Sequence, residues 1–173
     1  IRLLTYALIL FKILLKQFVC IFIIEVGYFF LLFKYSKGKL LKHQKVPLKY
    51  SFKEIDKYLS VNVSGHFNLY DAKKMFTEAL EMLVKKKLFK LFFNVYKVKG
   101  RITTMDRYDL GEYAAIEAIN FLLKGLQKLS VTFYGKEPII DPERFGELVA
   151  KNRGLNIKVT TDKNEALNFL ENG

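Results

Sequence analysis

LFKLFFNV, residues 88–95, is the stretch that decides the fold of this chain. It is short and mostly apolar, which is typical of a strand that is buried on both faces. Strands of that kind belong to largely parallel sheets that are covered by helices. The stretch therefore predicts a central strand of an α/β domain.

Two shorter strands are predicted before this stretch. They cover Val46–Phe52 and Tyr58–Val63, and residues 53–57 form the turn between them. Ser64-Gly65-His66 is expected to break the second strand, which leaves His66 in a surface loop. A hairpin of this kind adds an antiparallel edge to the sheet.

An amphipathic helix is predicted between the hairpin and the central strand. Asn68 is a good N-cap, and Asp71 stands at the third helical position, close to a capping box. Apolar residues then recur with the i, i+3, i+4 spacing of one helix face. They are Leu69, Ala72, Met75, Phe76, Ala79, Leu80 and Leu83.

Helices and strands continue to alternate after the central strand. A helix is predicted from Thr103 or Thr104 to about Lys124, followed by a strand Leu129–Tyr134. The next helix is capped by Asp141, has Pro142 at its first position and is closed by Gly154. A strand Asn156–Thr160 and a helix opened by Asp162 and Glu165 complete the domain. The order β-β-α-β-α-β-α-β-α predicts a single α/β domain. Its sheet is mixed but mostly parallel, with about five strands and four helices.

An apolar and basic leader, residues 1–45, precedes this domain, which we place at residues 46–173. Residues 18–33 read FVCIFIIEVGYFFLLF, with Glu25 as the only charge, and lysines follow. A helix of about 20 apolar residues spans a bilayer, so residues 17–33 are a candidate membrane helix that would hold the domain on the cytoplasmic side. The open alternative is translated sequence outside the natural protein, because the first methionine is Met75.

Charge and composition argue against several function classes. The net charge is +12, but residues 1–50 carry +8 of it, which fits a membrane surface better than a nucleic acid. Cys20 is the only cysteine, so neither an internal disulfide nor a multi-thiolate metal site is available. With two histidines in the chain, zinc chemistry is not expected, and neither a metal nor a cofactor is predicted.

Four stretches together resemble a known family. They are VNVSG at 61–65, GRITTMDRYDLGE at 100–112, GKEPIIDP at 135–142, and NRGLNIKV at 152–159 with Thr161-Asp162 after it. In this order they resemble the SpoIIAA-like branch of the STAS family, over about residues 46–171. That family is related in shape to Sec14-type lipid-binding domains. The resemblance implies a small non-enzymatic module that binds protein partners.

The family's phosphorylation site is only partly matched. In anti-sigma-factor antagonists, a serine at the start of the second helix is phosphorylated to switch partner binding. This chain lacks the Asp-Ser-Ser/Thr-Gly pattern, and Asn94 stands in the strand where the aspartate is expected. Thr103 and Thr104 occupy the helix start, where the resemblance places the phosphorylated residue, and are therefore the candidate phosphoacceptors.

The start of the second helix is also the candidate binding site on physical grounds. A helix N-terminus has free N–H groups and a positive dipole end, which suit a phosphate, a lipid headgroup or a carboxylate. The candidate ligand- or partner-binding residues are Lys99, Arg101, Thr103, Thr104, Asp106 and Arg107. The alternative is that a threonine only caps the helix and Arg101 is solvated.

Other polar groups are better explained by structure than by chemistry. Asp109 and Glu112 share a helix face and could mimic a paired-carboxylate site, but they also complement the helix dipole and could pair with Arg107 or remain unpaired. Residues 85–87 are lysines at a helix C-terminus, where the dipole favours them. We therefore expect the protein not to be an enzyme.

Two binding functions follow from these observations. The first is a regulatory module that contacts a protein partner around the second helix, on the cytoplasmic side of a membrane. The second is a small-molecule or lipid carrier of Sec14-like character, which draws on Phe76, Phe121, Phe133 and Phe145. Nucleic acid is not an expected partner, and an anionic or lipid ligand is a candidate.

Overall fold

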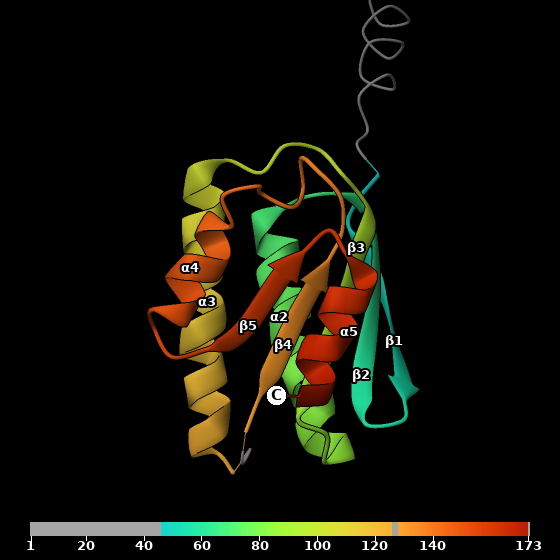
Figure 1. The fold of residues 1–173 in the computed structure, drawn as a ribbon, viewed down its shortest axis with the longest axis vertical. Coiled ribbons are helices and arrows are strands. Elements are labelled where there is room, and N and C mark those ends of the chain that lie inside the picture. Colours follow the sequence, from blue (N-terminus) through green and yellow to red (C-terminus); the bar gives the residue numbers. More distant parts are fainter. Residues whose placement is uncertain (1–45, 126–127, 173) are drawn as a thin grey trace, which may run out of the picture. The chain divides into compact units, whose positions relative to one another are not determined.

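The computed structural model describes residues 46–125 and 128–172, and it contains the predicted order of elements (Figure 1). The elements are β1 (Lys49–Ile55), β2 (Tyr58–His66), α2 (Leu69–Lys86), β3 (Lys90–Lys99), α3 (Thr104–Leu123), β4 (Ser130–Tyr134), α4 (Phe145–Lys151), β5 (Asn156–Thr160) and α5 (Lys163–Asn172). The leader and the candidate membrane helix at 17–33 lie outside the described residues. Within the described ranges, no helix is both long and apolar enough to cross a bilayer.

The five strands form one mixed sheet in the order β1-β2-β3-β4-β5. β1 runs antiparallel to β2, and the other three neighbouring pairs are parallel. Each parallel pair is joined by a crossover helix, as the alternating pattern predicts. The predicted fold class, an α/β domain with a mostly parallel sheet and an antiparallel edge, is confirmed.

Helices cover both faces of the sheet (Figure 1). α2 and α3 cover one face, where their buried side chains join the main apolar core, and α4 packs beside α3. α5 crosses the other face and contacts β3, β4 and β5. There Ala166 and Leu170 of α5 pack on Phe92 of β3 in a second, smaller cluster.

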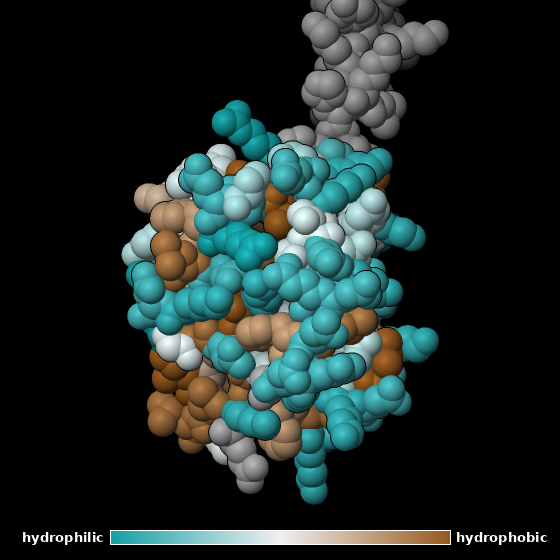
Figure 2. All heavy atoms as spheres, viewed as in Figure 1, coloured by the Kyte–Doolittle hydropathy of each residue, from teal (hydrophilic) through white to brown (hydrophobic). Residues whose placement is uncertain are grey.

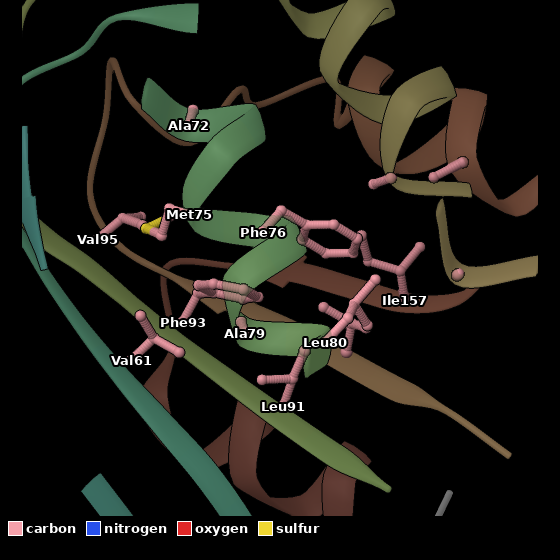
Figure 3. Close-up of a cluster of buried hydrophobic side chains, with 14 of the residues drawn as sticks. Val61, Ala72, Met75, Phe76, Ala79, Leu80, Leu91, Phe93, Val95 and Ile157 are labelled. Atoms are coloured by element: carbon pink, nitrogen blue, oxygen red, sulfur yellow. The ribbon is translucent and has the colours of Figure 1, made fainter. Parts of the chain in front are cut away.

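The stretch at 88–95 lies at the centre of this sheet. Phe92 points to the α5 side, and Phe93 points into the main core, where it is fully buried. The Phe93 ring lies between two other rings, 5.8 Å from Phe76 of α2 and 4.4 Å from Phe133 of β4. Figure 3 shows Phe93 and Phe76 among the aliphatic side chains of this core. The predicted doubly buried strand is confirmed, although β3 begins at Lys90 and continues to Lys99.

The hairpin is longer than predicted and lies further along the chain. β1 covers Lys49–Ile55, and only Asp56 and Lys57 form the turn. The segment 64–66 does not break β2, because a register shift between Asn62 and Ser64 keeps β2 paired with β3 up to His66. His66 is therefore the last residue of a strand, and its N–H donates to the carbonyl of Val46 at 2.9 Å.

The third predicted helix, α4, begins later than expected. Asp141 is not its N-cap, because residues 141–144 first form a turn closed by the Arg144 N–H and the Asp141 carbonyl, 3.0 Å apart. Arg144 then takes a left-handed conformation, and α4 starts at Phe145. The Asp141 carboxylate still accepts the N–H of Phe145, at 3.1 Å, so it caps the helix from one turn earlier.

The predicted N-caps of α2 and α5 are confirmed, whereas α4 ends at Lys151 with Asn152, not Gly154, as its C-cap. The Asn68 side chain accepts the N–H of Asp71 at 3.1 Å at the start of α2. Asp162 accepts the N–H of Asn164 at 2.8 Å at the start of α5. Gly154, with φ of +89°, ends the turn that follows α4.

Candidate functional site

The start of α3 is closed by a complete capping box. Thr103 is the N-cap, and its hydroxyl accepts the N–H of Asp106 at 3.1 Å. In return, one carboxylate oxygen of Asp106 accepts both the N–H of Thr103, at 3.0 Å, and its hydroxyl, at 2.7 Å. These bonds, the one from the hydroxyl above all, hold the pKa of Asp106 below its usual value. The Thr103 hydroxyl is thus engaged twice.

The exposed candidate residues surround this cap. Lys99 ends β3, Arg101 lies in the connection to α3, and Thr104 is the first residue of the helix. All three are exposed, and within the described part of the chain their side chains make no hydrogen bond or ion pair. Two cations and one hydroxyl therefore remain available to a partner at this helix start.

Arg107, by contrast, holds the fold together. Its guanidinium donates to the carbonyls of Ile139, at 3.0 Å, and Pro138, at 2.8 Å. Its Nε also lies 3.9 Å from the carboxylate of Asp141. These contacts connect α3 to the segment between β4 and α4. Arg107 therefore has a structural role and, unlike Lys99 and Arg101, is not available to bind a partner.

The suggested paired-carboxylate site is also occupied. Glu112 accepts from Arg153 at 2.7 Å and from the hydroxyl of Tyr108 at 3.2 Å. Arg153 donates to that hydroxyl too, at 2.8 Å, and lies over the Tyr108 ring. The hydrogen bond from Arg153 to Glu112 raises the pKa of the guanidinium. Neither of the two expected outcomes, pairing with Arg107 or no partner, holds for Glu112, because Arg153 pairs with it. Asp109 makes no ion pair within the described residues.

The lysines around the end of α2 have structural partners. Lys86 lies 2.6 Å from a carboxylate oxygen of Glu54 in β1. Lys87 ends the helix in a left-handed conformation. Lys90 donates to the carbonyls of Leu170 and Glu171, at the C-terminus of α5. These contacts agree with the structural interpretation of the lysine cluster.

One exposed surface was missed by the sequence analysis. In its C-terminal half, α3 carries four large apolar residues that solvent reaches, and we call them the α3 apolar patch. The patch consists of Ile116, Ile119, Leu122 and Leu123, which is 83 % exposed. In Figure 2, apolar side chains gather at the lower left, where Figure 1 places this half of α3.

α3 buries mostly small residues and exposes large apolar ones. Besides Phe121, the residues that α3 buries are small, namely Gly111, Ala114, Ala115 and Ala118, whereas the aliphatic residues of its C-terminal half face solvent. An ordinary surface helix shows the opposite, with large apolar residues inside and polar residues outside. The only sequence signal was that apolar residues occur on both faces of the helix. Periodicity alone does not reveal which face the sheet covers.

Comparisons with known proteins give matches in structure only. No protein-family model matches the chain, and no curated protein matches it. An anti-sigma factor antagonist from Mycobacterium paratuberculosis aligns with 13 % identity and a TM-score of 0.46, over 72 % of this chain and 95 % of that one. An uncharacterised protein with a SpoIIAA-like fold from Shewanella loihica aligns with 17 % identity and a TM-score of 0.41, over 74 % and 97 %.

The anti-sigma factor antagonist SpoIIAA in its unphosphorylated form is a third similar structure. It shares 9 % identity with a TM-score of 0.44, over 72 % of this chain and 98 % of that one. At these identities the similarity concerns the arrangement of helices and strands alone.

Replacing Thr103 with alanine is expected to lower the free energy of unfolding by about 1 kcal/mol at pH 7, the usual value of an N-cap. The pKa of Asp106 is lower in the folded state than its unfolded value of about 3.8, so its contribution is present above pH 4 and is lost as the pH falls through the folded pKa. The difference between wild type and Thr103→Ala should therefore shrink below pH 4. Equilibrium urea unfolding across this pH range measures it.

Thr104→Ala is the matched control for this prediction. It removes the same hydroxyl one residue later, where no cap bond is made, and should change stability by less than about 0.5 kcal/mol. An equal loss in both variants would contradict the capping role of Thr103.

Proposed function

We propose that this domain is a non-catalytic regulatory module that binds a protein partner along the outer face of α3. The observation that carries the proposal is the α3 apolar patch. Large aliphatic side chains at positions 116, 119 and 123 fall on one face of the helix and are 44–83 % exposed. Aligned exposed apolar residues are typical of protein-binding surfaces rather than of solvated helices.

The start of α3 supports the same surface. Met105 is 69 % exposed there, beside Arg101 and Thr104, whose side chains make no hydrogen bond or ion pair with the described residues. An apolar contact with an adjacent cation suits a partner that offers apolar side chains and a carboxylate or phosphate. The resemblance to the SpoIIAA-like branch also implies protein contacts around this helix. Control by phosphorylation at Thr103 or Thr104 stays a prediction, and Thr104 has the free hydroxyl.

The lipid-carrier alternative has less support. Of its four phenylalanines, Phe76 and Phe133 pack on Phe93 in the core. The apolar cavity near them measures about 120 Å³, whereas pockets for drug-sized ligands usually hold about 300–1,000 Å³. A complete lipid does not fit into that space. Residence on the cytoplasmic side of a membrane, with residues 17–33 as its anchor, stays a prediction.

Site-specific cross-linking of the full chain tests the proposal. A photo-reactive amino acid at position 123 should capture a defined protein from a native extract, and Ile119→Lys should reduce that capture at least about tenfold. The reduction is expected because the lysine would have to lose its hydration in an apolar contact.

Val84 provides the matched control for this experiment. It lies on α2 and is 43 % exposed, almost the same as Ile119 at 44 %. Val84→Lys should leave capture at position 123 unchanged. If both lysine variants reduce capture equally, or if position 123 captures no defined protein, the proposal is wrong.

A further inference from the structure

An apolar cavity of about 120 Å³ lies between the sheet and the helices on the α2–α3 side. The strand residues that line it include Val63, Val98 and Val159, which stand near the carboxyl ends of β2, β3 and β5. Ala72 of α2 and Ala114 of α3 line it from the helix layer. In α/β sheets, ligands bind preferentially at the carboxyl ends of the strands.

The space exists because the helices present small residues over this part of the sheet. Ala72 and Ala114 fill little volume, and both are buried. α3 and α4 are in close backbone contact beside this space, because a Cβ on Gly111 would lie 2.6 Å from the carbonyl oxygen of Gly146. These two helices therefore cannot move closer to each other there, and the small side chains of Ala72 and Ala114 leave the space open.

The charged side chains that line the cavity already have partners. Arg107 bonds the carbonyls of the segment before α4, as described above. Glu147, which is 6 % exposed, accepts the N–H of Val159 at 2.7 Å and Lys151 at 2.6 Å. Arg144 lies 3.9 Å from Glu165. None of these groups requires a polar ligand to satisfy it.

We infer that this cavity is a binding site for a small, uncharged hydrocarbon group of about the size of benzene. An engineered apolar cavity of about 150 Å³ stays dry and binds benzene or xenon, which sets the scale. Such a group comes either from a free aromatic or aliphatic molecule or from the end of an acyl chain. The inference does not depend on the protein partner proposed for α3.

Methyl NMR spectra of the full chain, titrated separately with three probes, test the inference. Toluene should shift the methyl signals of Val63, Val98 and Ile140, which all line the cavity. Benzoate, which has the same ring and a charge, should bind at least about tenfold more weakly, because a charge must be dehydrated to enter. Phosphatidylcholine vesicles that shift the same methyls would identify an acyl chain as the source, and vesicles without effect would identify a free molecule.

Filling the cavity provides the matched comparison. Ala114→Val should weaken toluene binding at least about tenfold, whereas Ala118→Val, on the same helix but outside the cavity, should leave it within about twofold. If Ala114→Val does not fold, Ala72→Val fills the space from α2 with the same expected result. Absence of toluene shifts at these methyls, equal binding of benzoate, or equal affinity in the filled and control variants would overturn the inference.

Discussion

Replacing Phe93 with alanine is expected to lower the free energy of unfolding by about 3–5 kcal/mol, the usual loss for a large buried aromatic residue. Phe93 is fully buried, and its ring contacts Phe76 on one side and Phe133 on the other. Its removal leaves a cavity between α2 and two central strands. Small domains have only about 5–15 kcal/mol of stability, so the loss should be visible directly in equilibrium urea unfolding.

Tyr96→Ala is the control for this prediction. Tyr96 is an aromatic residue of the same strand, but it is 46 % exposed, and among the described residues its ring stacks on Tyr134 and lies under the ammonium of Lys136. Its loss should cost less than about 1.5 kcal/mol. If the two alanine variants lose similar stability, the aromatic stack is not the centre of the core.

The central strand could be predicted because its signal is local and strong. A run such as LFKLFFNV has few stable places other than the interior of a sheet. The caps at Asn68, Thr103 and Asp162 were predictable for a similar reason, since each contacts the backbone two or three residues away. Features that depend on residues close together in the chain can therefore be predicted from the sequence.

The ends of the hairpin and the roles of the site residues were not predictable, because they depend on distant partners. β2 continues to His66 since β3 offers it a pairing partner up to Lys99. Arg107 reaches carbonyls 31 and 32 residues further along the chain, and Arg153 reaches a carboxylate 41 residues before it. The sequence alone could not show which cations near α3 have partners in the fold and which remain exposed.

α3 separates the two surfaces to which we assign binding. The small residues of α3 face the core, where Gly111 and Ala114 line the cavity, while the large aliphatic residues of its C-terminal half face solvent and form the α3 apolar patch. Since the two lie on opposite faces of the helix, Ala114→Val and Ile119→Lys should each affect one binding event and not the other. Loss of both in either variant would indicate a general disturbance of α3.

Gly65→Ala is the second substitution with a large expected effect, about 2–5 kcal/mol lost from the free energy of unfolding. Gly65 has φ of +102°, which costs other residues about 1–2 kcal/mol. A Cβ at this position would also lie 2.2 Å from the carbonyl oxygen of Pro47. That atom belongs to the backbone just before β1, so the clash is relieved only by moving the start of the strand, at a further cost of about 1–3 kcal/mol.

Gly154→Ala separates the two contributions to this loss. Gly154 also has a positive φ, +89°, but a Cβ there meets no atom within 4 Å. It should therefore lose only the conformational part, about 1–2 kcal/mol. Hydrogen exchange gives an independent readout, because the bond from the His66 N–H to the Val46 carbonyl should weaken in Gly65→Ala and not in Gly154→Ala. Equal losses in the two variants, with the His66 amide equally protected, would show that the contact with Pro47 does not constrain the edge of the sheet.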